Sequence, residues 1–154
     1  NLANSYSPPR VTRIPSTGDL LLIWNQVSNE EIQRGYRRGR LSSAISTDDG
    51  ESWKHFRTLE VSEGLDKKVR YVEPDIEVKP VRARMDLGEL PDDFTIYHYP
   101  NVAFVREKVF LLYFIGSWNN TEKITTAQRS RPCTEQSWAK RVLRVLPREW
   151  FYRE

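Results

Sequence analysis

The chain has 154 residues, of which 38% are hydrophobic and 12% aromatic, and its formal net charge is +3, with 24 basic and 21 acidic residues. This length suffices for one domain with a core of its own, and a charge so close to balance does not call for a nucleic-acid partner. One cysteine excludes an intrachain disulfide, two histidines argue against a zinc site, and no run approaches the roughly 18 apolar residues of a membrane span.

The first half of the chain is predicted to form four antiparallel strands. Residues 10–14 alternate and stop at Pro15, and residues 19–25 have the pattern of a buried strand. A third strand is predicted over 41–45 and a fourth over 53–59. Many aromatic residues, nine prolines and little alanine favour β-structure as well. Four antiparallel strands with short turns are typical of a propeller blade.

The turn between the third and fourth strands has a distinctive form. Residues 46–53 read Ser-x-Asp-x-Gly-x-Ser-Trp. Asp48 can fold its carboxylate back onto turn N–H groups, Gly50 can take a positive φ, and Trp53 returns towards the core after the strand that ends at Ser46. The pattern resembles the Asp-box, or BNR, repeat of sialidases and other β-propeller proteins, and it matches at every fixed position. Such a turn indicates fold rather than chemistry.

The second half repeats the first. Residues 100–105 correspond to the first strand, 108–114 to the second and 123–128 to the third. Ser137 and Trp138 echo the end of the 46–53 turn, although the residues before them lack its Asp and Gly. Internal repetition of this kind is expected of propellers.

These observations predict an all-β fold with two four-stranded antiparallel blades. A ring usually has about four to eight blades, so we expect a piece of a sialidase-like propeller of about six blades. Its other blades would lie in the same parent chain, with an upstream region missing before Asn1, or in other copies. Between the two blades lies a charged insertion, residues 62–93. Apolar and polar residues alternate in it enough to predict an extra hairpin, and a flexible loop is the alternative. The expected boundaries are 7–61 and 94–146 for the blades, 62–93 for the insertion and 147–154 for a C-terminal tail.

The resemblance to sialidases extends beyond the turn. The segments 7–25, 38–46, 97–102 and 146–152 look like the last two blades of bacterial exo-sialidase-like proteins. This resemblance implies the C-terminal part of a glycoside hydrolase that acts on sialic acid or a related acidic glycan. It implies a retaining mechanism with a tyrosine nucleophile. No cofactor and no metal are expected.

Two residues match functional positions of that family. Arg38 matches a late arginine that grips the substrate carboxylate, for which a guanidinium fork is suited. Its neighbours Arg37 and Arg40 leave the register open and are possible substrate contacts; a solvated basic loop is the alternative. Tyr99 matches the nucleophile position, since a neutral phenol approaches an anomeric centre that bears a carboxylate with little repulsion. The alternative for Tyr99 is an ordinary inner-strand aromatic.

Other candidates are given structural roles. Arg13 opens an Arg-Ile-Pro triplet found in sialidases, but its late-blade setting favours a structural role. His98 alternates with Tyr99, so we expect it on the opposite side of the strand, packed or at the surface. His55 is expected to be exposed, and Asp49 is expected to serve as a turn residue.

The resemblance leaves the enzyme assignment open. The acid/base Asp and the glutamate that partners the tyrosine would lie upstream, so the chain alone is expected to be inactive. The alternative is a non-catalytic glycan-binding or scaffold module. Nucleic-acid binding through the basic segment 33–40 is a third, weaker hypothesis, and no membrane partner is expected. The parent would be secreted or periplasmic if it carries a signal peptide.

Overall fold

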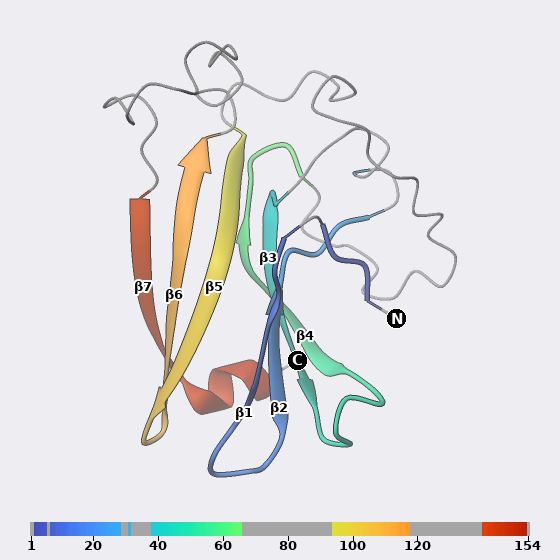
Figure 1. Cartoon of the computed structure of the whole chain (residues 1–154), viewed down its shortest axis with the longest axis vertical. Coiled ribbons are helices and arrows are strands. Elements are labelled where there is room, and N and C mark those ends of the chain that lie inside the picture. Colours follow the sequence, from blue (N-terminus) through green and yellow to red (C-terminus); the bar gives the residue numbers. More distant parts are fainter. Residues whose placement is uncertain are drawn as a thin grey trace.

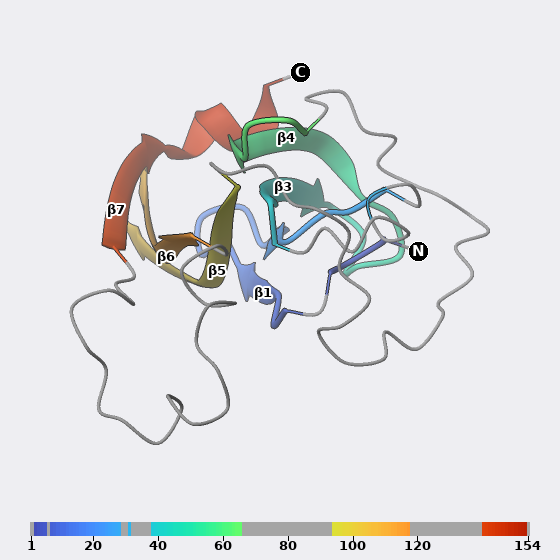
Figure 2. The same cartoon turned by 90° about the horizontal axis from the view of Figure 1, so that it is seen from above.

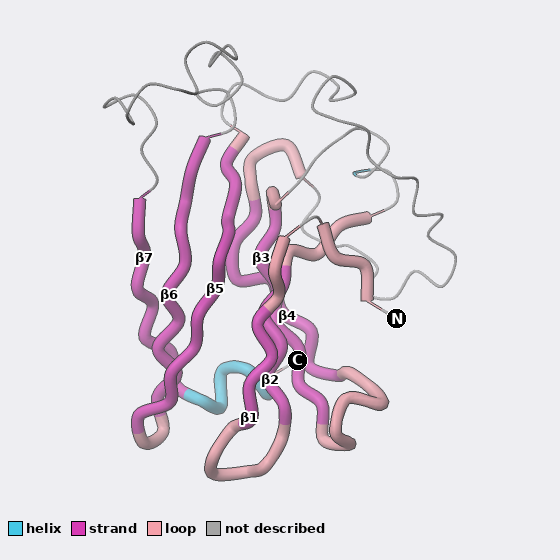
Figure 3. The backbone as a smooth tube through the Cα atoms, viewed as in Figure 1, coloured by secondary structure: helices cyan, strands magenta, loops and turns pink. Residues whose placement is uncertain are grey.

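Seven β-strands and one short 3₁₀ helix form the part of the chain that the structure, a computed structural model, describes (Figures 1 and 3). That part comprises residues 2–5, 7–28, 31, 38–65, 94–117 and 140–153. No helix within it has the length and hydrophobicity to cross a membrane. The elements are β1 (Arg10–Arg13), β2 (Leu20–Trp24), β3 (Arg40–Ser46), β4 (Lys54–Val61), β5 (Thr95–Val105), β6 (Lys108–Ser117), β7 (Lys140–Pro147) and the helix η2 (Arg148–Tyr152).

Sheet 1 is an antiparallel meander in the order β1-β2-β3-β4. All four strands expected in the first half are confirmed, each to within two residues at either end. Leu21 pairs with Ile45 and Ile23 with Ser43 in the centre of the sheet. Both central strands are buried on both faces over nearly their whole length, which explains why their apolar residues run on instead of alternating.

Sheet 2 has three strands in the order β5-β6-β7. β5 and β7 occupy the two edges of β6. Val142 and Leu146 of β7 pair with Tyr113 and Val109 of β6, so their alternation matches the apolar side of β6. The segment 123–128 and the Ser137–Trp138 echo lie outside the described residues.

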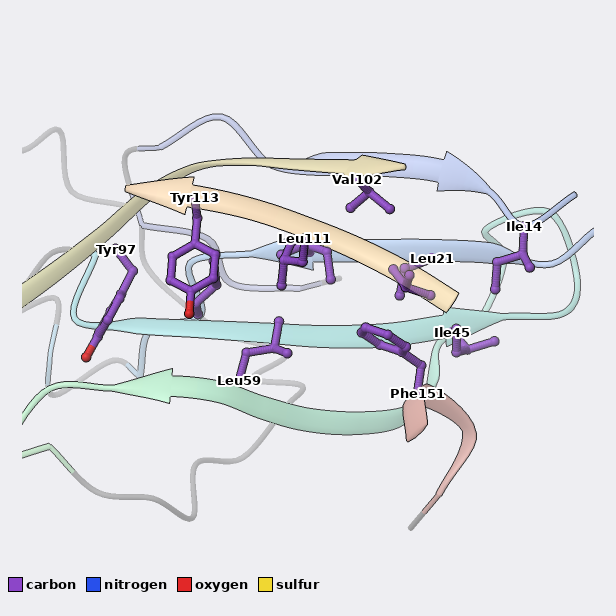
Figure 4. Close-up of a cluster of buried hydrophobic side chains, with 12 residues drawn as sticks. Ile14, Leu21, Ile45, Leu59, Tyr97, Val102, Leu111, Tyr113 and Phe151 are labelled. Atoms are coloured by element: carbon purple, nitrogen blue, oxygen red, sulfur yellow. The ribbon is translucent and has the colours of Figure 1, made fainter. Parts of the chain in front are cut away.

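The two sheets pack face to face around one core (Figure 4). Viewed from above, β5 lies beside β1 and β3, and η2 runs from β7 across to β4 (Figure 2). Within the expected C-terminal tail, η2 inserts Phe151 between the sheets, and Arg57 of β4 donates to the Trp150 carbonyl oxygen at 3.1 Å. The buried core residues come from both sheets: Ile14, Leu21, Ile23, Leu41, Ile45, Leu59, Tyr97, Val102, Val109, Leu111, Tyr113 and Phe151.

The outer faces of the two sheets differ. On sheet 1, Trp24 and Ala44 are buried beneath neighbouring side chains, and the Trp24 indole N–H donates to the Ala3 carbonyl oxygen at 3.0 Å. On sheet 2, Leu112 and Leu143 remain 38% and 59% exposed. The described strands form an all-β pair of open sheets, and neither sheet closes on itself.

Candidate functional site

The 46–53 turn is organised by its own side chains. The Ser46 hydroxyl oxygen accepts the Gly50 N–H at 2.8 Å, and one Asp48 carboxylate oxygen accepts the Ser46 hydroxyl at 2.7 Å and the Ser52 N–H at 2.8 Å. Hydrogen bonds from the Ser52 hydroxyl and N–H, and then from Ser46, lower the pKa of Asp48 to about 2. Gly50 has φ of 98°. These contacts hold a turn and leave no group placed for chemistry.

Arg13 belongs to the same end of sheet 1. Its guanidinium donates to the Gly18 carbonyl oxygen and pairs with Asp49 at 2.8 Å. Since β1 ends at Arg13 where β3 ends at Ser46, Arg13 lies at the opposite end of the sheet from Arg38. The structural role expected for Arg13 agrees with these contacts.

Arg38 and Tyr99 are brought together although they come from different sheets. The Arg38 Cζ atom lies 5.5 Å from the centroid of the Tyr99 ring, within the range of a cation–π interaction. Two hydrogen bonds hold the backbone of Arg38, just before β3. Its carbonyl oxygen accepts the Tyr97 N–H at 2.8 Å, and its N–H donates to the Ser5 hydroxyl at 2.9 Å. The sequence-predicted pair therefore shares one place, beside the first half of β5.

Two further features hold the sheets together beside this pair. The Asn25 side-chain amide donates to the carbonyl oxygens of Arg40, at 3.0 Å, and Tyr97, at 2.7 Å, and so joins β3 to β5. A Cβ atom on Gly39 would lie 2.6 Å from side-chain atoms of both Leu65 and Phe94. A side chain at position 39 would have to displace these two side chains, so glycine lets the residue after Arg38 pack directly against Leu65 and Phe94.

A β-bulge turns Tyr99 out of the strand. His98 pairs with Phe114 and Asn101 with Leu112, so two residues of β5 face a single residue of β6. Tyr99 adopts φ of 54° and is 52% exposed. A positive φ is rare for an aromatic residue and costs conformational energy, a feature that clusters at functional sites.

The bulge corrects one expectation. His98 was expected to face away from Tyr99, yet the two rings lie 4.8 Å apart. Counting alternate residues assumes a regular pleat, and the positive φ at Tyr99 breaks it. Both rings therefore lie on the outer side of sheet 2, whereas Tyr97 points into the core (Figure 4).

Three strands supply the remaining members of the cluster. His98, Phe114 and Arg141 pair in register across β5, β6 and β7. The His98 and Phe114 rings stack at 5.8 Å, Tyr99 meets Phe114 edge-on at 6.3 Å, and the Arg141 Cζ atom lies 5.3 Å from the Phe114 centroid. Together with Arg38 these residues form the Arg38–Tyr99 cluster. Sequence reasoning missed Phe114 and Arg141, because cross-strand register decides their place.

Arg40 has a different environment from Arg38. Its side chain is 0% exposed, and its two terminal nitrogens donate to the two Glu31 carboxylate oxygens at 2.9 and 2.6 Å. Glu31 also accepts the Ser28 N–H at 2.9 Å. In this conformation the Arg40 guanidinium is committed to the interior, so it is not among the groups that face a ligand. Arg37, the other possible contact, lies outside the described residues.

Apart from the Arg38–Tyr99 cluster, a group of tyrosines around one carboxylate lies between the sheets. Glu60 accepts the Tyr113 hydroxyl and, at 3.0 Å, the Arg144 guanidinium. Burial and then the Glu60 charge raise the pKa of Tyr97 to about 12, and burial with the Glu60 hydrogen bond raises the pKa of Tyr113 further. Both hydroxyls are therefore held neutral and link the sheets. Of the tyrosines described here, Tyr99 is the one at the cluster.

Over the described ranges, no three His, Cys, Asp or Glu side chains gather in a way that could hold a metal ion. Comparison with family models, curated proteins and solved structures finds no match to this chain. The groups that the site offers for chemistry are the Arg38 guanidinium, the exposed Tyr99 phenol beside it and the half-buried His98 imidazole.

Proposed function

We propose that the Arg38–Tyr99 cluster binds the carboxylate-bearing sugar of an acidic glycan. The observation that carries this proposal is the 5.5 Å approach of the Arg38 guanidinium carbon to the ring of the half-exposed Tyr99. A guanidinium binds a carboxylate through paired hydrogen bonds, and an aromatic ring with a hydroxyl offers an apolar face and a polar tip to a sugar. Sialic acid combines these two features, an acid group on a sugar ring.

We further propose that the chain is the C-terminal part of a sialidase-like glycoside hydrolase. In that role Tyr99 would attack the anomeric carbon and Arg38 would hold the substrate carboxylate. The chain alone would not turn over substrate, since a carboxylate base for the phenol and an acid for the leaving group would come from upstream blades. The exposed apolar side chains of sheet 2, such as Leu143 and Val145, support further blades packing there. Those blades would belong to the parent chain or to other copies.

One observation favours the alternative of a non-catalytic glycan-binding or scaffold module. Across the described residues, no carboxylate accepts a hydrogen bond from the Tyr99 hydroxyl. A tyrosine hydroxyl needs such a base to act as a nucleophile. Binding without turnover is the behaviour this alternative predicts, and it uses the same two residues.

The binding proposal is tested by comparing free N-acetylneuraminic acid with its methyl ester by NMR titration. The acid should bind and the ester should bind at least tenfold more weakly, a difference of about 1.4 kcal/mol, because esterification removes the charge that Arg38 recognises. Arg38→Gln should weaken binding of the acid by a similar factor. Arg153→Gln makes the same change at an exposed arginine beyond η2 and should leave binding unchanged. Equal binding of acid and ester would refute the proposal.

Catalysis is tested on the full-length parent with a fluorogenic sialoside. Hydrolysis that is lost in Tyr99→Phe, while N-acetylneuraminic acid still binds, supports the nucleophile role. An intact sialoside combined with retained binding favours the non-catalytic module. Hydrolysis that continues in Tyr99→Phe contradicts the assignment of Tyr99.

A further inference from the structure

His98 is enclosed by the Arg38–Tyr99 cluster without a polar partner for one of its nitrogens. Its ring stacks on Phe114 and lies 4.8 Å from the Tyr99 ring. The Nδ1 atom is buried and has no hydrogen-bond partner within the described part of the chain, although buried polar atoms are nearly always paired. A side chain with unused hydrogen-bonding capacity, packed beside two members of a candidate anion site, is suited to respond when the site is occupied.

The charges around His98 are positive. Over the residues described, the charge that acts on its ring is that of Arg38, and Arg141 of β7 lies over the Phe114 ring on which the imidazole stacks. On its own strand the neighbouring titratable group is Tyr99. Burial, and then the Arg38 charge, lower the pKa of His98 below its usual value. The imidazole is thus neutral near pH 7, and its protonation is opposed by the same guanidinium that we assign to the ligand.

We propose that anion capture at Arg38 is linked to proton uptake by His98, so that the site binds its carboxylate ligand more tightly in mildly acidic solution. The inference rests on the ligand role of Arg38 in the proposed function. A bound carboxylate offsets the Arg38 charge and so removes part of what opposes protonation of His98. The protonated imidazole then places a second cation beside the anion. Because linkage is reciprocal, each event favours the other by the same factor.

The size of the effect follows from the change in pKa that the ligand causes. Each unit by which a carboxylate raises the pKa of His98 makes binding about tenfold tighter on the acid side than on the alkaline side. The increase should begin as the pH falls through the pKa of ligand-bound His98 and level off below the pKa of the ligand-free group, which lies below the ordinary histidine value of about 6.5. Above that range both states carry a neutral imidazole and the affinity should be constant.

The experiment uses NMR of the imidazole ring protons, which is simple here because the chain has only two histidines, His55 and His98. Benzoate serves as the first probe, since it offers a carboxylate on an apolar ring without sugar hydroxyls. Benzoate should raise the pKa of His98 and bind about tenfold more tightly at pH 5 than at pH 8. In the absence of ligand, Arg38→Gln should also raise the pKa of His98, because it removes the opposing charge.

Two variants separate the linkage from general pH effects. His98→Gln should give one affinity at all pH values, whereas the matched change His55→Gln, on β4 of sheet 1, should keep the dependence. The wild-type ring titration with and without benzoate does not rely on any variant, so it decides the matter even if His98→Gln fails to fold. A His98 pKa that is unmoved by benzoate, whether benzoate binds or not, overturns the inference.

The outcome also separates this inference from the proposed function. If benzoate shows the proton linkage and N-acetylneuraminic acid does not bind, the linkage holds and the glycan assignment fails. If N-acetylneuraminic acid binds through Arg38 with the same affinity at pH 5 and pH 8, the glycan assignment holds and the linkage is wrong.

Discussion

The two sheets share one core but differ in what they do with their other face. Sheet 1 buries Leu22, Trp24 and Ala44 on its outer side, whereas sheet 2 leaves Leu143 and Val145 largely exposed on its outer side. Most of the outer side of sheet 1 is therefore covered by the chain itself, although Val11, which pairs with Leu22, is 48% exposed. Sheet 2 presents apolar surface, and the candidate site lies at one end of that surface. An exposed apolar face of this kind marks a surface that function or assembly uses.

Residues with a left-handed backbone occur in both sheets, at different kinds of position. Left-handed backbone in the turn of sheet 1 falls at Asp49 and Gly50, where side-chain hydrogen bonds to the backbone stabilise it. Sheet 2 has it at Tyr99, inside β5, and at Arg106, in the turn after β5. Strand β4 of sheet 1 also holds one such residue, His55, near its start. Asp49 and Gly50 make a turn, whereas Tyr99 places its ring beside Arg38. Left-handed backbone thus forms the turn in sheet 1, and in sheet 2 one instance of it falls at the candidate site.

The largest expected effect tests whether the interior of sheet 1 depends on its buried ion pair. Glu31→Ala should lower the free energy of unfolding by about 3–5 kcal/mol, because it removes a carboxylate that pairs with the fully buried Arg40 guanidinium. Urea denaturation measures the change. Glu63→Ala, at an exposed glutamate, is the control and should have little effect. The double change Glu31→Leu with Arg40→Met should recover most of the loss, and failure to do so would show that the pair does more than neutralise charge.

The next prediction compares the two faces of sheet 2 through residues on one strand pair. Leu111→Ala should cost about 2–5 kcal/mol, since the side chain is 0% exposed in the shared core. Leu143→Ala, on the outer face, should change stability by less than about 0.5 kcal/mol. Thermal unfolding of the two variants gives the comparison. A large loss in Leu143→Ala would mean that the outer face is already covered in solution.

The four strands of sheet 1 and its turn are predictable because their signals are local: the apolar runs of β2 and β3, and the fixed spacing from Ser46 to Trp53. The juxtaposition of Arg38 and Tyr99 agrees with the family resemblance, which placed both at one site. Alternation and turn chemistry alone do not predict contacts between sheets.

The remaining features depend on contacts between segments distant in sequence. The bulge at Tyr99 arises from the register of β5 against β6, and the position of β7 beside β6 depends on which apolar faces match. Arg40 is buried and paired with Glu31, although the sequence around it resembles an exposed basic segment. No local pattern marks these features, so strand counting misplaced His98 and left Phe114 out of the site.

A smaller effect belongs to the turn of sheet 1. Ser46→Ala should destabilise the protein by about 1 kcal/mol, because the hydroxyl links the Gly50 N–H to the Asp48 carboxylate. Thr47→Ala, at an exposed position in the same turn, should be nearly neutral in chemical denaturation. Ligand binding at the other end of the sheet should be unchanged in both variants. Weakened binding in Ser46→Ala would contradict the separation of turn and site.

The smallest expected effect distinguishes the two sheets by the pH range in which each loses stability. The pKa of Asp48 is lowered to about 2 in the folded state, so the stability that the turn carboxylate contributes is present above its unfolded value near 3.8 and is lost as pH falls towards 2. The pKa of His98 is also lowered, but His98 is a base. The unfolded chain therefore takes up its proton first, and stability should decline as pH falls below about 6.5.

Urea midpoints between pH 8 and pH 5 should fall in the wild-type chain. His98→Gln should reduce that fall, whereas His55→Gln should retain the His98 contribution. A carboxylate ligand should oppose the fall, since binding at Arg38 favours the protonated imidazole. An equal slope in the wild type and His98→Gln would place the titrating group elsewhere and remove the distinction between a sheet that carries the turn and a sheet that carries the site.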